Sequence, residues 1–354
     1  MALAKPEAQR LARQCFSVDI DLPSEVMTLA RLWGGMGHVF RVRWKKPDPA
    51  SMIVKLVDIR QADPKDRGDR RKIDSYTVEA NFYRYYSADL QKLHNVALPT
   101  FLYEEQEELR TVTLCLTELN PLRTSTNHRD VLDWLARFHA ATWHLDATAG
   151  TTCPSVQPRG TYWHLDTRPD EWADMRQHGW VGRLRRAARP IDTFLHSETT
   201  TELRSWVHGD AKEANVLETP PPNEGSAPCI AMCDFQYVGP GCPLQDVCYF
   251  LCSSGVAENT ALVDYYYGQL NNYHCSGKQS SEVIDRNEFD FVLEVCYCDY
   301  MRFMCGWGQW GSDISKRVVS WLDLVDGGQL LDSEAAYDEA IQVAFVRAKS
   351  GLLK

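Results

Sequence analysis

The chain has 354 residues, of which 44% are hydrophobic and 24% charged, so it is long enough to bury a large core in one or two domains. This composition excludes a disordered, collagen-like or coiled-coil protein. The 38 lysines and arginines against 48 aspartates and glutamates give a net charge of −10, which would repel a phosphate backbone and therefore disfavours nucleic acid as a partner.

The sequence gives no sign of a membrane-inserted segment. No stretch approaches the roughly 20 apolar residues that span a bilayer, and the first residues lack the apolar region of a secretory signal. We therefore expect a cytoplasmic protein whose 12 cysteines are reduced thiols. Their spacings, such as Cys229 to Cys233, lack the paired C-x2-C halves of a structural zinc site.

The first predicted elements are two strands. Residues 32–44 (LWGGMGHVFRVRW) contain Gly34, Gly35 and Gly37 and then alternate apolar and polar side chains, which predicts a glycine turn that leads into a half-buried strand. Residues 51–57 (SMIVKLV) predict a second strand. Side chains alternate between the faces of a strand, so Lys55 is expected on the same face as Ile53 and Val57.

A loop and a helix follow. Residues 58–75 are charged and without hydrophobic period, which predicts a loop, and residues 76–93 predict a helix that carries Glu79. Apolar alternation returns at 111–119, which predicts the last strand of an N-terminal domain ending at residue 119.

The remainder predicts a mostly helical domain over 120–354. Residues 130–143 have the period of a buried helix, and residues 256–348 are mostly helical by pattern and rich in tyrosine and tryptophan. Residues 207–217 and 229–236 are expected to be neighbouring ends of a hairpin, separated by a proline-rich loop. Four arginines lie between the predicted helix over 130–143 and residue 207, and they are expected on a solvated face: Arg183, Arg185, Arg186 and Arg189.

These predicted elements contain the parts of a phosphoryl-transfer site, namely a glycine turn before a strand, a lysine within a strand, a glutamate on a helix and polar residues near strand ends. Glycine-loop amides can lie against phosphates, a strand lysine neutralises their charge, and a helix carboxylate holds that lysine. One aspartate can orient a hydroxyl and accept its proton, while an asparagine and a second aspartate offer the hard oxygen ligands that Mg2+ prefers. Asp210, Asn215 and Asp234 are the candidates for these last three roles.

The strings H-G-D-A-K-E-A-N at 208–215 and D-F-Q at 234–236 resemble the H-G-D-x4-N and D-F-Q motifs of the aminoglycoside phosphotransferase and choline kinase-like superfamily. The D-F-Q form is most similar to its CHK, or ecdysteroid kinase-like, branch. The D-x4-N spacing also equals that of the protein-kinase catalytic loop. The segment QDVCYFL at 245–251 resembles the stretch that follows the metal motif, and the likeness covers roughly residues 30–250.

The resemblance implies an α+β, two-lobed protein-kinase-like fold: an N-lobe of antiparallel strands with one helix and a mostly helical C-lobe, with ATP in the cleft between them. It implies transfer of the γ-phosphoryl of ATP to a hydroxyl of a small molecule. The implied roles are a base (Asp210), ligands for Mg2+ (Asn215 and Asp234), α/β-phosphate binding (Lys55), positioning of that lysine (Glu79), phosphate contact (Gly34, Gly35 and Gly37) and adenine contact through the backbone (Glu118 and Leu119).

Other functions compete with this hypothesis. A pseudokinase would keep the fold and bind nucleotide or a partner without catalysis, although it would be expected to have lost Asp210 or Asp234. A protein kinase is disfavoured because the chain lacks D-F-G, A-P-E and a recognisable activation loop between Asp234 and Asp246. His208 and Asp246 are expected to be structural. The acceptor's identity is left open, and the aromatic residues near Tyr297 and Trp310 are expected to be core residues rather than a pocket for a cation.

Overall fold

The computed structural model describes residues 2–45, 51–60, 62–63, 65–107, 111–121, 127–145, 156–197, 202–220, 228–276, 283–308 and 310–352. The chain divides into two compact units. The N-terminal unit contains Met1–Ser125, Thr152–Val156 and Val216–Gln236, and the C-terminal unit contains Thr126–Thr151, Gln157–Asn215 and Tyr237–Lys354.

The N-terminal unit is built on a five-stranded antiparallel sheet with the order β1-β2-β3-β5-β4. Its strands are β1 (Glu25–Arg31), β2 (Gly37–Arg43), β3 (Ser51–Asp58), β4 (Phe101–Glu107) and β5 (Thr111–Leu116). Its helices are α1 (Lys5–Phe16), α2 (Arg67–Tyr85) and α3 (Ser87–His94).

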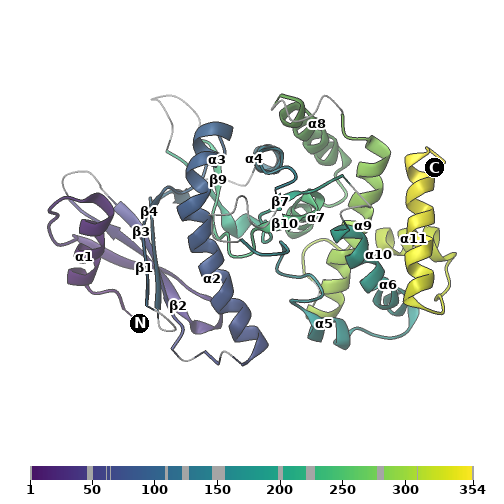
Figure 1. Cartoon of the computed structure of the whole chain (residues 1–354), viewed down its shortest axis with the longest axis horizontal. Helices are drawn as coiled ribbons and strands as arrows, with labels where there is room; N and C mark the ends of the chain where they lie inside the picture. Colours follow the sequence, from purple (N-terminus) through teal and green to yellow (C-terminus); the bar gives the residue numbers. More distant parts are fainter. Residues whose placement is uncertain are drawn as a thin grey trace. The chain divides into compact units, whose positions relative to one another are not determined.

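The two faces of this sheet are covered by different helices, with α1 on one side and α2 on the other (Figure 1). Met52 and Val54 of β3 pack in one cluster with Leu11 of α1, whereas Val57 packs in another with Tyr76 of α2. The predicted alternation along β3 is thereby confirmed. It directs Lys55 to the α2 side of the sheet.

Helix α2 begins earlier than the sequence predicts. Residues 67–75, expected in a loop, form its first turns, and the expected single helix over 76–93 is divided at Tyr86 into α2 and α3. The side chain of Asp66 caps the helix by accepting a hydrogen bond from the backbone N–H of Asp69 at 2.8 Å. Such a cap stabilises a helix start whose mostly charged residues show no hydrophobic period.

A second, three-stranded sheet completes the N-terminal unit, with the order β6-β8-β9. It contains β6 (Asn120–Pro121), β8 (Val216–Glu218) and β9 (Ile230–Met232). Strands β8 and β9 pair antiparallel, which confirms the predicted hairpin. Residues 221–227 of its proline-rich loop lie outside the described residues.

The C-terminal unit is mostly helical, as predicted. Its helices are α4 (His128–Ala141), α5 (Pro169–Asp174), α6 (Gly179–His196), α7 (Pro243–Ser253), α8 (Thr260–Ser276), α9 (Arg286–Trp307), α10 (Ser315–Asp326) and α11 (Glu334–Lys349). One short antiparallel pair joins β7 (Ser205–Val207) to β10 (Gly239–Gly241).

Helix α9 is the centre of this unit and packs against α5, α6, α7, α10 and α11. Tyr297 and Tyr300 are fully buried on it, so these two aromatic residues belong to the core, as expected. Asp299 is fully buried as well, where it accepts two hydrogen bonds from the guanidinium of Arg302 at 2.7 and 3.0 Å. Burial of a charge requires such a partner, and the pair satisfies that requirement.

The expectation that the arginines of residues 183–189 share a solvated face is wrong for Arg183. Its side chain is 11% exposed and donates to Asp326 at 2.9 Å and to Asp323 at 2.7 Å. These contacts join α6 to α10. Two carboxylates that stand more than 130 positions further along the chain compensate the charge, which no local pattern in α6 could reveal.

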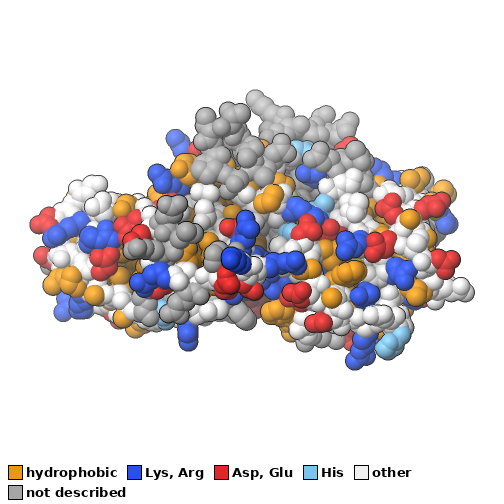
Figure 2. Space-filling view, turned by 60° about the horizontal axis from the view of Figure 1, so that its bottom comes forward, with side chains coloured by type: hydrophobic (Ala, Val, Ile, Leu, Met, Phe, Trp, Pro, Cys, Tyr) orange, Lys and Arg blue, Asp and Glu red, His pale blue; other side chains and the backbone are white. Residues whose placement is uncertain are grey.

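On the face of the molecule in Figure 2, lysine and arginine side chains alternate with aspartate and glutamate side chains. The net negative charge is therefore not gathered into one acidic patch on that face. Among the described residues, no helix is long and apolar enough to cross a membrane, and the cysteines are free thiols.

Candidate functional site

The structure brings three of the predicted site residues together in the N-terminal unit. Lys55 lies in β3 with its Nζ 2.6 Å from Oε2 of Glu79 on α2 and 2.9 Å from Oδ1 of Asp234, which follows β9. Lys55 is 7% exposed and Glu79 is 3% exposed, so water screens the pair only weakly. The ammonium of Lys55 is thus held by two carboxylates from separate segments, on the face of the sheet that α2 covers.

Burial and charge act against each other on the protonation of this cluster. Burial by itself lowers the pKa of Lys55, but the carboxylates of Asp234 and Glu79 outweigh it and hold the pKa above its usual value. Burial raises the pKa of Glu79 to about 7, and the charge of Asp234 adds to that shift while Lys55 opposes it. Lys55 is therefore cationic at neutral pH and available to bind an anion.

The glycine turn lies between β1 and β2, where Trp33–Gly35 form a 3-10 turn. Gly34 and Gly35 have positive φ values of 71° and 72°, which glycine adopts without steric cost. A Cβ at Gly37 would lie 2.1 Å from the carbonyl oxygen of Leu56, so only glycine allows β2 to approach β3 there. The turn and the strand pairing account for these glycines.

The segment after β5 contains the residues expected to contact adenine. The predicted strand over 111–119 ends at Leu116, and Glu118 and Leu119 lie in the connection to β6. The carboxylate of Glu118 accepts hydrogen bonds from Arg43 at 2.7 and 3.2 Å. The Glu118 side chain is thus engaged by the last residue of β2. The predicted contact with adenine would therefore be made by the backbone of Glu118.

The predicted base lies in the C-terminal unit, in the loop after β7. Asp210 is 6% exposed, and among the described residues three side chains donate to its carboxylate. Lys212 Nζ is 2.7 Å from Oδ2, Asn215 Nδ2 is 3.0 Å from Oδ2, and the hydroxyl of Tyr249 is 3.2 Å from Oδ1. These donors fix the carboxylate in one orientation.

Asn215 also donates to the backbone carbonyl of Asp210 at 2.9 Å. With its nitrogen directed to Asp210, the amide oxygen is the atom that offers lone pairs to a cation. Taken singly, the amide oxygen of Asn215 and the carboxylate oxygens of Asp234 are hard donors of the kind that Mg2+ prefers. The donor chemistry of the two predicted residues therefore fits that metal.

The backbone of this loop is held from beneath, as the sequence predicts. The carboxylate of Asp246, on α7, accepts hydrogen bonds from the amides of His208 at 2.6 Å and Gly209 at 2.9 Å. Gly209 has a φ of 81°, and a Cβ there would lie 2.3 Å from the carbonyl oxygen of Tyr237. His208 is fully buried and accepts from the amide of Asp210 at 3.2 Å. The structural roles expected for His208 and Asp246 are confirmed.

His139 of α4 extends this support and was not predicted from the sequence. Its ring is fully buried, 3.1 Å from Oδ2 of Asp246 and 2.7 Å from the hydroxyl of Tyr266. The signal for it was present only as a histidine within a buried helical pattern, which is usual for a core position.

Lys212 and Tyr249 were also not predicted, although both lie within the motifs at 208–215 and 245–251. Burial raises the pKa of the Tyr249 hydroxyl, and the charge of Asp210 raises it further, so Tyr249 remains protonated and can donate. Its hydroxyl is 3.2 Å from that of Tyr162, and its ring contacts Trp310 at a centroid distance of 5.8 Å. Asp210 thus adjoins a group of aromatic side chains.

A positive charge of the protein itself already lies among these aromatic rings. The guanidinium of Arg168 is 4.9 Å from the ring centre of Trp307, 5.2 Å from that of Tyr162 and 5.7 Å from that of Phe303. Trp307 is 46% exposed and Trp310 is 37% exposed, so the expectation that these aromatic residues lie in the core is wrong for the two tryptophans. The cation–π position that a cationic acceptor could use on these rings is taken by Arg168.

The loop that carries Tyr162 also contains a buried histidine whose titration should affect stability. Burial lowers the pKa of His164 from 6.5 to about 3, and the charge of Arg159 contributes. Below pH 6.5 the histidine is protonated in the unfolded chain but stays neutral in the native chain. The free energy of unfolding is therefore highest above pH 6.5 and decreases as the pH falls toward 3. The loss should reach about 2 kcal/mol at pH 5.

Denaturant unfolding of His164→Gln between pH 5 and 8 checks this expectation. The variant should lose less stability on acidification than the wild type by about that amount. His178→Gln is the matched control, because His178 is exposed, and its curve should run parallel to that of the wild type. A His164→Gln curve parallel to the wild type would contradict the assignment.

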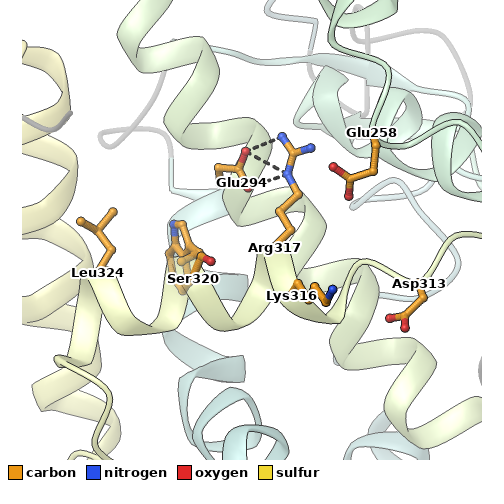
Figure 3. Close-up of a pocket in the computed structure, with 8 residues that line it drawn as sticks. Glu258, Glu294, Asp313, Lys316, Arg317, Ser320 and Leu324 are labelled. Carbon is orange, nitrogen blue, oxygen red and sulfur yellow. Dashed lines mark hydrogen bonds and ion pairs between the residues drawn. The ribbon is translucent and has the colours of Figure 1, made fainter.

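A depression in the C-terminal unit has a volume of about 780 Å³, but none of the predicted site residues lines it. Figure 3 shows Arg317 directed toward Glu294, and its Nε donates to that carboxylate at 2.7 Å. The guanidinium also lies 4.1 Å from the ring centre of Tyr297. Its charge is thus engaged within the protein, and the depression is separate from the predicted chemistry.

Comparison with known proteins gives the family and the fold. The sequence matches the model of the phosphotransferase enzyme family (APH) over residues 28–278, and no curated protein matches it. An amicoumacin kinase solved with AMP-PNP, Ca2+ and Ami is 11% identical, with 98% of this chain and 93% of that chain covered and a TM-score of 0.54.

Two further solved structures are similar. A microcompartment-associated aminopropanol kinase is 14% identical, with 98% of each chain covered and a TM-score of 0.49. A choline/ethanolamine kinase family protein from Mesorhizobium loti is 13% identical, with 98% of this chain and 95% of that chain covered and a TM-score of 0.48.

The expected α+β kinase-like fold is confirmed by the five-stranded antiparallel sheet, the helical C-terminal unit and the likeness to the amicoumacin kinase. The family match spans more than two thirds of the sequence and includes Lys55, Asp210 and Asp234. The chain therefore belongs to the phosphotransferase enzyme family.

Proposed function

We propose that this protein is an ATP-dependent small-molecule kinase that transfers the γ-phosphoryl group of Mg-ATP to a hydroxyl group. The observation that carries the proposal is the buried contact of Lys55 with both Glu79 and Asp234. A buried lysine paired with a helix carboxylate is the arrangement that binds nucleotide phosphates in kinase-like enzymes. The AMP-PNP bound to the amicoumacin kinase supports the use of a nucleotide.

In this proposal Asp210 is the base. Its carboxylate orients the acceptor hydroxyl and takes its proton while the acceptor oxygen bonds to the γ-phosphorus and the bond to the bridging oxygen of ADP breaks. The three donors around Asp210 fix its direction, so the hydroxyl meets a carboxylate that needs no reorientation. The products are ADP and a phosphorylated acceptor.

The nucleotide would be bound by the N-terminal residues. We assign phosphate binding to Lys55, held by Glu79, with the amides of the turn at Gly34, Gly35 and Gly37, and adenine binding to the backbone of Glu118 and Leu119. Asn215 and Asp234 would hold Mg2+ through oxygen atoms. When bound, that ion neutralises phosphate charge.

This proposal assigns nucleotide binding to residues 1–119, and the base and the acceptor site to residues 120–354. The segment Val216–Gln236 belongs to the N-terminal unit and contributes Asp234 to the proposed nucleotide site.

The D-F-Q form at 234–236 supports membership of the CHK, or ecdysteroid kinase-like, branch. The proposed use of ATP supports a cytoplasmic location. The aromatic side chains beside Asp210 support an acceptor with an apolar or cyclic body.

Calorimetric titration of the full chain with ATP, with and without Mg2+, tests the proposal without knowledge of the acceptor. We expect affinity on the order of micromolar that depends on Mg2+ and weakens in Asp234→Ala, because the variant loses a carboxylate ligand. Such a result leads to an acceptor screen in which mass spectrometry detects a mass gain of one phosphoryl group. Absence of ATP binding under both conditions would refute the proposal and favour a binding module without catalysis.

A further inference from the structure

Asp234 is held in an unusual backbone conformation. Its φ is 70°, in the left-handed region that residues with a side chain seldom adopt. Such a conformation costs of order 1 kcal/mol and persists only where surrounding contacts maintain it. Lys55 is one of these contacts, with its Nζ 2.9 Å from Oδ1.

Gln236 supplies a second contact to the same oxygen. Its Nε2 donates to Oδ1 of Asp234 at 2.6 Å, and its Oε1 accepts from the hydroxyl of Ser75 at 3.0 Å. Ser75 is fully buried on α2, where its hydroxyl also lies 2.8 Å from the carbonyl oxygen of Lys72. The single hydroxyl proton is therefore shared between two acceptors.

Helix α2 consequently reaches Asp234 by two routes. Glu79 acts through Lys55, and Ser75, one helical turn before Glu79, acts through Gln236. Both routes end on Oδ1 of Asp234. Two separate donors on one oxygen define the plane of the carboxylate, which a single donor would leave free to rotate.

We infer that Ser75 and Gln236 are positioning residues that hold the Asp234 carboxylate in the orientation in which it binds Mg2+. This inference rests on the proposed function. Hydrogen bonds to a metal-binding side chain set its orientation, and their removal lowers metal affinity by about tenfold or more. The third residue of the D-F-Q string thereby has a defined role, because it connects Asp234 to α2.

The test is calorimetry of ATP binding to the full chain, with Mg2+ and with EDTA, in Ser75→Ala and Gln236→Met. Neither change removes a proposed phosphate ligand, so affinity without metal should stay within about twofold of the wild type. The gain in affinity that Mg2+ confers should fall by about tenfold in both variants. Ser75→Thr retains the hydroxyl and should restore the gain.

Ser87→Ala is the matched control. Ser87 is also buried on a helix and its hydroxyl also donates to the carbonyl one turn earlier, that of Tyr83, but it lies on α3 rather than on α2. In Ser87→Ala the increase in ATP affinity that Mg2+ confers should equal that of the wild type. The positioning role alone would be overturned if this increase were unchanged in Ser75→Ala and Gln236→Met, or if it fell equally in Ser87→Ala. A wild-type chain that binds no ATP would overturn the proposed function, and this inference with it.

Discussion

Asp210→Asn should reduce phosphoryl transfer to less than a few per cent of the wild-type rate. The substitution keeps the size of the side chain and removes its capacity to accept the acceptor's proton, and loss of a general base lowers the rate by about 10²- to 10⁴-fold. Binding of Mg-ATP should persist, because Asp210 is not among the proposed nucleotide ligands. The measurement is phosphorylation of an acceptor identified by the screen, together with calorimetric ATP affinity.

Glu213→Gln is the matched control for this experiment. Glu213 is a neighbouring carboxylate in the same loop, but its side chain is 47% exposed and 3.7 Å from Nε2 of His128, so its neutralisation should leave transfer nearly unchanged. Transfer that survives in Asp210→Asn above a few per cent would show that another group acts as the base.

Lys55→Met should abolish ATP binding and destabilise the protein by about 3 kcal/mol or more at pH 8. The variant leaves the buried carboxylate of Glu79 without its ammonium partner. The pKa of Glu79 is about 7 with Lys55 present, and Lys55 opposes its rise, so removal of Lys55 raises it further. Above pH 7 the native variant therefore retains a proton that the wild type and the unfolded chain have lost. The destabilisation should therefore grow as the pH rises above 7 and shrink toward pH 6.

A second variant separates the two effects of Lys55. In Lys55→Met/Glu79→Gln no ionisable buried acid remains at position 79, so most of the lost stability should return, whereas ATP binding should not. Lys72→Met is the matched control on α2, since Lys72 is 29% exposed and pairs with nearby Asp69 at 3.1 Å. Its stability should change by less than about 1 kcal/mol. Recovery of ATP binding in the double variant would refute the phosphate-binding role of Lys55.

Several features of this protein were readable from short-range patterns. The two-residue period of β3 placed Lys55 with Val57 on one face and Met52 on the other, as observed. The H-G-D-x4-N string and D-F-Q indicated a family resemblance at the superfamily level, which the match over residues 28–278 supports. Pattern suffices here because side-chain alternation and motif spacing depend on residues only a few positions apart.

Other features lacked a local signal. Strand β1 is mostly exposed, so it shows no alternation of buried residues, and the start of α2 depends on a cap at Asp66 rather than on hydrophobic period. The burial of Arg183 depends on carboxylates of α10, which lie 140 and 143 positions away. Solvent exposure of a charged helix face is the usual outcome, and tertiary contacts overrode it at this position.

The kinase-like fold class, the phosphotransferase family and the types of residue offered for catalysis could all be inferred from the amino-acid sequence. The hydrogen bonds that hold the proposed base and the proposed metal ligand became visible in the folded chain: Tyr249 binds Asp210 across 39 positions, and Ser75 binds Gln236, which contacts Asp234, across 161. This difference arises because a hydrogen bond depends on distances of a few tenths of an ångström and on direction. Packing of distant segments sets those quantities, and no spacing along the chain encodes them.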